Sequence, residues 1–359
     1  MPPLTIPSET VPGWSPRFEI SPAVTEIKTW DRARAKGPLD MTHFAEAYEA
    51  PAITFTPLGR TTVPGNSFCV RGEELGVLRE SLTLVGGAMW AEVVVPGDKL
   101  VSIDNEEPAL VCGNLAVINY YHWTLQCLAN LLVYRRLTGS DDFTAIVPTL
   151  TGFRAQLVAL SDFCGRTVEI EADEVLTANH GIYGNLCGGA FSFAPHPATM
   201  AEFDALAAEV EAERSFGKRI YASRLDARNM RGVVNEEAVC DLMLRHGFEI
   251  ITPGELSVEE QIAAFRDADV IVSPHGAGLA NLVYCRTGSR TRVVELLQSS
   301  YIPGSYIRIC QAKGLDYTGI VSSDAMPLDE NGNPLPQRNF NNINNAVDLD
   351  LLDKVLSGL

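Results

Sequence analysis

Residues 269–281 read Asp-Val-Ile-Val-Ser-Pro-His-Gly-Ala-Gly-Leu-Ala-Asn and carry the clearest fold signal in the chain. The first five residues form an apolar run typical of a buried strand, and the glycines permit a tight turn into a following helix. Comparable apolar runs at 219–223, 248–252 and 292–297 are each followed by a helical pattern. Strands that alternate with helices predict a parallel, doubly wound sheet, so the predicted fold class is α/β.

The alternation also sets the expected domain organisation. It begins near residue 217, directly after an Ala- and Glu-rich segment that predicts a helix. Further upstream, residues 120–138 predict a long helix that ends at Gly139. The sequence therefore predicts an N-terminal domain over 1–197 with an irregular Pro-rich start, a linker helix over 198–216, a C-terminal Rossmann-like domain over 217–328, and an Asn-rich connection with a final helix over 329–359.

The composition restricts the partners and the compartment. The 359 residues include 28 Lys and Arg but 45 Asp and Glu, so the formal net charge is −17. Such an acidic protein is a poor general binder of nucleic acid or anionic membranes. Binding of a small anion in a local basic pocket stays an alternative. No apolar run approaches the roughly 18 residues of a transmembrane helix, and the Pro-rich start has no signal-peptide pattern. Eight dispersed cysteines without a Cys-x-x-Cys pair favour a reduced, cytoplasmic protein, with peripheral membrane contact left open.

A cluster of basic residues stands out against this acidic background. Arg224, Arg228 and Arg231 follow the strand at 219–223, at the carboxyl end where open α/β sheets bind their ligands. A planar guanidinium suits two-point contact with phosphate, so these residues indicate a phosphate site. The alternative is a solvated loop whose arginines pair with neighbouring carboxylates.

A second candidate site begins at His275, where the strand 269–273 ends. The free N–H groups at a helix start form an anion site, and glycines let the backbone approach a ligand. Glu295 ends the next strand, where its carboxylate would suit ribose hydroxyls. The glycine pattern is half of an NAD-binding fingerprint, with Asn281 in place of the third glycine. A tight packing turn would also explain the glycines but not the adjacent His275. The residues of this turn are Gly276, Ala277 and Gly278.

A polar stripe marks the predicted helix over 120–138. Asn119, His122, Gln126 and Asn130 are spaced by three, four and four residues, so they share one helix face. The other faces are apolar, and buried polar side chains need hydrogen-bond partners. Those partners are either structural groups or a substrate.

Neither Asp-x-Asp sequence indicates a metal site. Asp267-Ala-Asp269 enters a strand at its amino end, and Asp348-Leu-Asp350 lies in the terminal segment. Since neither lies at the expected ligand edge, we predict that a metal ion is not required.

Three blocks of sequence, taken together, resemble glycosyltransferase family 61, which includes plant xylosyltransferases and O-linked N-acetylglucosaminyltransferases. The likeness extends over about residues 110–300, and bacterial members, among which this chain would fall, are linked to surface polysaccharide. The blocks are Asn119-Tyr-Tyr-His122-Trp123, then Ile220-Tyr-Ala-Ser-Arg224 continuing through Arg228 and Arg231 to Asn235, then Val270 to Asn281 with Glu295 behind it.

The resemblance implies a GT-B fold, in which two Rossmann-like domains face each other across a cleft and the C-terminal helix crosses back to the first domain. It implies an inverting, metal-independent transferase without a cofactor, which moves a sugar from a nucleotide-sugar donor to a glycan or lipid-linked acceptor in polysaccharide biosynthesis. His122 would be the catalytic base, with Asn119, Trp123 and Gln126 on the acceptor side. The donor would be bound by Arg224, Arg228, Arg231, Asn235, His275, Gly276, Ala277, Gly278, Asn281 and Glu295.

One position departs from the family pattern. The family usually has Asp four residues after the histidine, and this chain has Gln126. Glutamine can hydrogen-bond but cannot accept a proton at neutral pH. Two alternatives therefore stay open: an inactive homologue that binds a nucleotide or glycan, and an NAD-type Rossmann oxidoreductase.

Overall fold

A computed structural model describes residues 2–25, 27, 41–73, 75–82, 99–188, 194–225, 231–325 and 343–359. The chain forms two compact units. The first consists of Met1–Thr10 and Glu49–Leu206, and the second of Val11–Tyr48 and Ala207–Leu359. This division differs from the sequence-based one in the N-terminal segment, because residues 11–48 group with the second unit.

The second unit is built on a mostly parallel sheet, as the sequence predicts. The described strands follow the order β14-β13-β15-β16-β17, and every neighbouring pair in that series is parallel. β17 also pairs with β3 in parallel orientation and, nearer its carboxyl end, with β18 in antiparallel orientation. The bounds are β3 (Arg17–Ile20), β13 (Arg219–Ala222), β14 (Glu249–Ile251), β15 (Val270–Pro274), β16 (Arg292–Gln298), β17 (Asp316–Ala325) and β18 (Asn344–Ala346).

Pairing of β3 with β17 explains why the N-terminal segment belongs to this unit. Arg17 forms an ion pair with Asp316 at 3.0 Å, and the ring of Trp14 lies 6.1 Å from that of Tyr317. These contacts join residues about 300 positions apart, and a local apolar pattern does not reveal them.

Helices connect the strands of the second unit. The α6 helix begins with a capping box, in which Ser257 and Glu260 bond each other's backbone N–H groups. The turn after β15 leads into a 3₁₀-helix rather than an α-helix. The bounds are η1 (Thr42–Ala45), α5 (Glu236–Arg245), η6 (Pro253–Glu255), α6 (Val258–Arg266), η7 (Ala277–Tyr284), α7 (Ser305–Lys313) and α8 (Leu349–Ser357).

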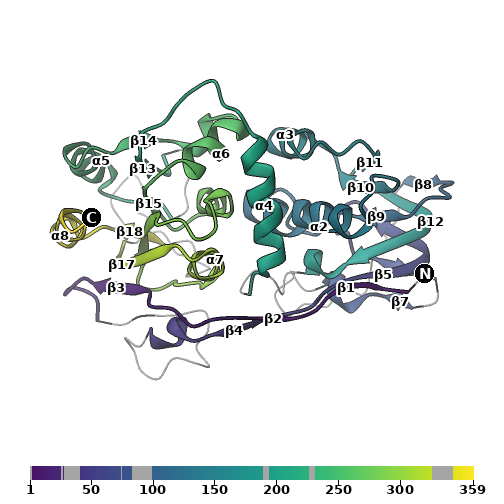
Figure 1. The fold of residues 1–359 in the computed structure, drawn as a ribbon, viewed down its shortest axis with the longest axis horizontal. Coiled ribbons are helices and arrows are strands. Elements are labelled where there is room, and N and C mark those ends of the chain that lie inside the picture. Colours follow the sequence, from purple (N-terminus) through teal and green to yellow (C-terminus); the bar gives the residue numbers. More distant parts are fainter. Residues whose placement is uncertain are drawn as a thin grey trace, which may run out of the picture. The chain divides into compact units, whose positions relative to one another are not determined.

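The C-terminal helix α8 requires a correction. Leu352 and Leu356 of α8 are buried in the same core as Tyr221, Val239 and Val272 of the second unit. Figure 1 shows α8 beside α5, with which it is in contact. The prediction that this helix crosses back to the first domain is therefore wrong, since its apolar face is buried within the second unit.

The first unit contains a mixed sheet. Its described strands follow the order β11-β10-β9-β12-β5-β6-β7, with β1 on β5 and β8 on β12. The strands β8 to β12 pair in parallel, as in a Rossmann-like half, whereas β5 runs antiparallel to β12. The bounds are β1 (Leu4–Ile6), β5 (Ile53–Pro64), β6 (Arg71–Gly72), β7 (Gly76–Val77), β8 (Lys99–Ile103), β9 (Ala109–Val111), β10 (Thr144–Pro148), β11 (Arg166–Ile170) and β12 (Glu174–Gly184); β2 (Glu9–Val11) and β4 (Tyr48–Ala50) form a separate pair.

The predicted long helix of the first unit is confirmed, but its middle is a π-helix. It consists of α1 (Tyr120–His122), the π-segment η3 (Trp123–Leu128) and α2 (Ala129–Thr138), and it ends at the left-handed Gly139. Such wide turns often occur at functional sites. The other described helices of this part are η2 (Arg79–Leu82), α3 (Phe153–Leu160), η4 (Asn185–Gly188) and α4 (Pro197–Glu209). Among the described helices, none has both the length and the apolar character required to cross a membrane.

Candidate functional site

The topology of the second sheet places the candidate site. Numbered along the chain, the five parallel strands have the order 2-1-3-4-5, so the winding direction reverses between β13 and β15. In open α/β sheets, ligands bind at this reversal, outside the carboxyl ends of the strands. Arg224 follows β13 and His275 follows β15, so the structure brings these two predicted residues to that position.

Arg224 lies directly against Gly276. A Cβ atom placed on Gly276 would be only 1.4 Å from the Nη1 atom of Arg224. The φ angle of Gly276 is 174°, which is extended backbone open to any residue. Glycine at this position therefore leaves room for the guanidinium, which a larger residue would displace.

Arg231 has an unusual backbone conformation. Its φ of 55° lies in the left-handed region, which costs a non-glycine residue about 1–2 kcal/mol. Its Nε is buried and, within the part of the chain that the structure describes, has no hydrogen-bond partner. Strained backbone positions cluster at ligand-binding sites, so Arg231 is a candidate for such a role. The third predicted arginine, Arg228, lies outside the described residues.

His275 and Glu295 form a buried pair close enough to Arg224 and Arg231 to be affected by their charges. Burial lowers the pKa of His275, the Glu295 carboxylate raises it, and the charges of Arg231 and Arg224 lower it further. The His275 Nδ1 atom lies 2.5 Å from Oε1 of Glu295, and the Tyr317 hydroxyl donates to Oε2 at 2.7 Å. The carboxylate thus holds the proton of a neutral His275 on Nδ1 and leaves Nε2 as an acceptor.

This geometry corrects the role predicted for Glu295. Its side chain is 0% exposed, and both of its oxygens already accept hydrogen bonds inside the unit. A carboxylate so enclosed cannot reach ribose hydroxyls. Glu295 instead orients His275.

Two predicted donor-binding asparagines are also structural. The Asn235 side chain donates to the Val347 carbonyl at 2.9 Å and accepts from its N–H at 3.0 Å, which fastens the C-terminal segment. The Asn281 side chain is fully buried and donates to Gln261 and to the Gly278 carbonyl. Both side-chain polar atoms of Asn235 are therefore used internally, and Asn281 is buried away from solvent, so neither is placed to contact the donor directly.

Ala277 and Gly278 remain at the expected edge. They are half-buried and open the η7 helix directly after the turn at Gly276. The first N–H groups of a helix lack intrahelical partners, so anion binding at this turn stays a prediction.

His122 in the first unit is held by an amide instead of a carboxylate. Its Nδ1 atom lies 3.2 Å from Oε1 of Gln126, which also accepts from Asn114 at 2.7 Å. Because that oxygen only accepts, the neutral His122 ring carries its proton on Nδ1 and has a free lone pair on Nε2. Burial lowers the pKa of His122, and the bond to Gln126 raises it.

The residues beside His122 do not form an acceptor surface as predicted. Trp123 is only 1% exposed and Gln126 is 0% exposed, so neither can contact an acceptor. Asn119 caps the helix by accepting from the N–H of Tyr121 at 2.9 Å. Asn130, the fourth member of the stripe, donates to the Val111 carbonyl. The stripe is structural, except that it orients the half-buried His122.

The Asp-x-Asp residues lie where the sequence places them. Asp267 pairs with Arg266 at 2.8 Å, and Asp269 directly precedes β15, so both lie at the amino edge of the sheet. Asp348 caps α8 and accepts from Ser21. Asp267 and Asp269 are therefore away from the arginines, whereas Asp348 lies near the carboxyl ends of β3 and β17, where its carboxylate accepts from Ser21 and from the Leu351 N–H.

Sequence reasoning missed three residues of these networks. Tyr317 lies on β17, Tyr301 packs its ring 5.5 Å from that of His275, and Asn114 supports Gln126. Tyr301 and Asn114 each come three residues after a strand, at a carboxyl end, and that position is the only sequence signal that could have indicated them.

Comparison with known proteins gives one match. Residues 120–294 match the protein-family model described as Glycosyltransferase 61. The matched segment contains the His122 helix, Arg224, Arg231 and the turn at His275, and it ends one residue before Glu295. No curated protein matches the chain.

Proposed function

Because the chain belongs to glycosyltransferase family 61, we propose that it transfers a sugar from a nucleotide-sugar donor to a hydroxyl group of a glycan or lipid-linked acceptor. The observation that carries the donor assignment is the cationic cluster at the winding reversal of the second sheet. Arg224 lies over a glycine, and the strained Arg231 has a buried Nε to which no hydrogen-bond partner is assigned among the described residues.

In the proposed reaction, the diphosphate of the donor binds Arg224, Arg231 and the turn Gly276–Gly278. An acceptor hydroxyl attacks the anomeric carbon from the face opposite the diphosphate, so the configuration inverts. The bond from the anomeric carbon to the phosphate oxygen breaks, and its electron pair leaves with the diphosphate. Guanidinium and N–H groups stabilise that developing charge in the manner of a metal ion, so the proposal requires none.

His122 is the proposed base in this reaction. In its neutral form the Nε2 lone pair can accept the proton of the acceptor hydroxyl. Gln126 supports this role by holding the Nδ1 proton at 3.2 Å, although an amide does not stabilise the imidazolium as a carboxylate would.

The strand order weighs against the oxidoreductase alternative. In a dinucleotide-binding fold the glycine fingerprint follows the first strand, whereas here Arg224 follows the first strand and the glycines follow the third. The inactive homologue is favoured by Gln126 alone. We also propose that the reaction serves polysaccharide biosynthesis, as the family resemblance implies, and that it takes place in the cytoplasm, where eight free cysteines are expected to stay reduced.

Isothermal titration tests the donor assignment. We expect pyrophosphate and either UDP or GDP to bind, and Arg224→Ala to weaken that binding by about 1.5–3 kcal/mol, the range for charge-assisted hydrogen bonds. Arg245→Ala, on the exposed surface of α5, is the matched control and should change nothing. Preference for NAD over both nucleotides would support the oxidoreductase. Unchanged affinity in a folded Arg224→Ala would refute the site.

A further inference from the structure

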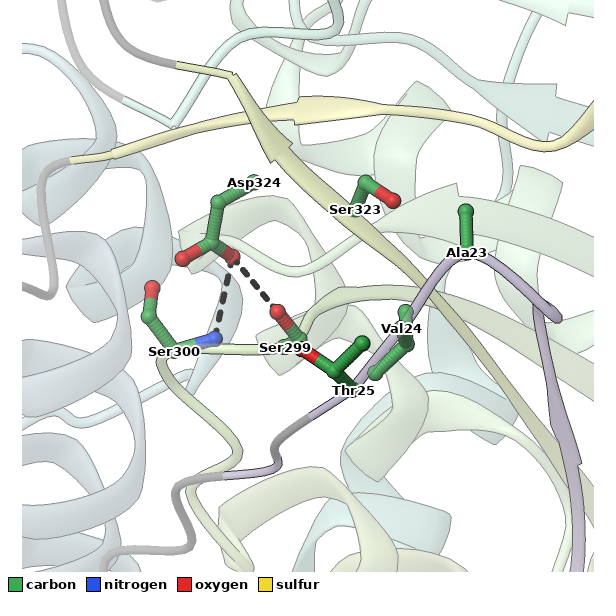
Figure 2. Close-up of a pocket in the computed structure, with 7 residues that line it drawn as sticks. All are labelled: Ala23, Val24, Thr25, Ser299, Ser300, Ser323 and Asp324. Atoms are coloured by element: carbon green, nitrogen blue, oxygen red, sulfur yellow. Dashed lines mark hydrogen bonds between the residues drawn. The ribbon is translucent and has the colours of Figure 1, made fainter.

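A small polar pocket lies in the second unit, on the same edge of the sheet as the proposed phosphate site. It encloses about 240 Å³ at the carboxyl ends of β16 and β17. Figure 2 shows Ser299 and Ser300 on one side of it, Ser323 and Asp324 on another, and Thr25 of the N-terminal segment completing the wall. The volume is below the roughly 300–1,000 Å³ of pockets that hold drug-sized ligands, so it suits a single sugar ring.

The polar groups of the pocket favour a ligand with hydroxyl groups. Oδ1 of Asp324 accepts from the Ser299 hydroxyl at 3.1 Å and from the Ser300 N–H at 3.0 Å, which fixes the carboxylate. Within the described residues, no group donates to the other oxygen, Oδ2. A fixed carboxylate repels phosphate but accepts hydrogen bonds from hydroxyl groups. The pocket therefore suits the hydroxyl groups of a ligand, whereas Arg224 and Arg231 suit its phosphates.

The position of the pocket connects it to those arginines. Ser300 lines the pocket, and the next residue, Tyr301, packs its ring 5.5 Å from that of His275. In the sheet, β16 and β17 are the first and second strands beyond β15. At a spacing of about 4.8 Å per strand, the pocket lies roughly 5–10 Å from the turn at Gly276 and roughly 10–15 Å from the end of β13, which Arg224 follows. One nucleotide can bridge that separation.

We infer that this pocket binds the ribose of the donor nucleotide, with Oδ2 of Asp324 accepting from a ribose hydroxyl. The inference rests on the proposed function, because it assigns the diphosphate of the same ligand to Arg224 and Arg231. Asp324 thereby takes the ribose-binding role predicted for Glu295 from the sequence, since the enclosed carboxylate of Glu295 orients His275 instead.

The test compares ligands with and without the ribose hydroxyls. Isothermal titration is carried out with pyrophosphate, with UDP or GDP, and with the matching 2′-deoxy and 3′-deoxy nucleotides. The wild-type protein should bind the ribonucleotide about 10- to 100-fold more tightly than at least one deoxy form, the range of one hydrogen bond to a charged group. Asp324→Asn should remove most of that difference and leave pyrophosphate affinity unchanged or tighter. Asp241→Asn, an exposed carboxylate on α5, is the control.

The possible failures separate the two proposals. If pyrophosphate binds through Arg224 but a folded Asp324→Asn protein keeps the full ribose preference, the ribose pocket is refuted and the phosphate site stands. If Asp324→Asn weakens only a nucleotide sugar and not the free nucleotide, the pocket holds the transferred sugar and the ribose assignment is wrong. If the wild-type protein binds neither pyrophosphate nor any nucleotide, both proposals are refuted.

Discussion

The Nδ1 nitrogen of His275 lies 2.5 Å from Oε1 of Glu295, inside a unit where the histidine is 7% exposed and the carboxylate 0%. Tyr317 donates to the second carboxylate oxygen, so the carboxylate has a partner on each side. Two arginine charges lie close enough to lower the pKa of His275 further. His275 is therefore a neutral imidazole with a fixed orientation, next to the proposed phosphate site.

The first prediction concerns the dependence of stability on pH. Burial, the largest cause, lowers the pKa of both His275 and His122 in the folded protein. Below the unfolded histidine pKa of about 6.5, the unfolded chain therefore binds protons that the folded chain does not. The free energy of unfolding should fall as the pH drops from 7 to 5.5, by up to about 1.4 kcal/mol per pH unit for each histidine.

Thermal unfolding across that range measures the effect. His275→Gln should flatten the dependence, because glutamine does not titrate. A melting temperature that rises towards acid pH, or the same slope in His275→Gln, would contradict the assignment of a neutral His275.

Arg231 provides the second prediction. Glycine accepts a φ of 55° without strain, so Arg231→Gly should leave the free energy of unfolding unchanged or raise it by up to about 1 kcal/mol. The same change removes a phosphate-binding cation and should weaken UDP or GDP binding about 10-fold or more. Asp162→Gly, at an exposed position with a φ of 51°, relieves similar strain and should not alter binding. If Arg231→Gly binds the nucleotide normally, the strain at Arg231 does not serve the ligand.

The third prediction uses the contact between Gly276 and Arg224. A methyl group on Gly276 would overlap the guanidinium, so Gly276→Ala must displace it and should weaken pyrophosphate binding about 10-fold or more. A methyl group on Gly278 meets Pro253 at an ordinary 3.4 Å and leaves Arg224 in place, so Gly278→Ala should have a smaller effect. Equal losses in both variants would show that the loop backbone, not Arg224, determines the affinity.

His122 and Gln126 provide the fourth prediction. Gln126→Glu keeps the oxygen that lies 3.2 Å from Nδ1 and adds a negative charge, which should raise the pKa of His122. The acidic limb of the pH–rate profile should then move to higher pH. His122→Ala should lower kcat about 10²–10⁴-fold while nucleotide binding stays near normal. A purely structural His122 would instead cost about 1–3 kcal/mol of stability, with activity lost only through unfolding.

Much of the second unit could be predicted from the sequence, because short stretches of residues define its strands and helices. Apolar runs such as 269–273 define buried strands, and the carboxyl-end rule placed Arg224, Arg231 and His275 together. The pairing of β3 with β17 could not be predicted, because a short strand carries no signal of a partner so distant in sequence.

The roles of individual polar residues were harder to predict. Asn235, Asn281 and Glu295 are at the expected edge, yet their hydrogen bonds are satisfied inside the protein. Residue type alone does not distinguish an internal partner from a ligand. The sequence did not indicate Asp324, because its strand lies beyond the blocks that resemble the family. Its neighbours are evident only from the three-dimensional pocket.

The most direct test of the central claim is proton NMR of the protein with a panel of nucleotide sugars and candidate glycan acceptors, in the presence of EDTA. For one donor the anomeric signal should disappear, the free nucleoside diphosphate should appear, and a product of opposite anomeric configuration should form. Arg224→Ala should abolish this turnover, and the chelator should not. A donor that binds but is never consumed, a retained configuration, or activity that EDTA abolishes and manganese restores would contradict the account.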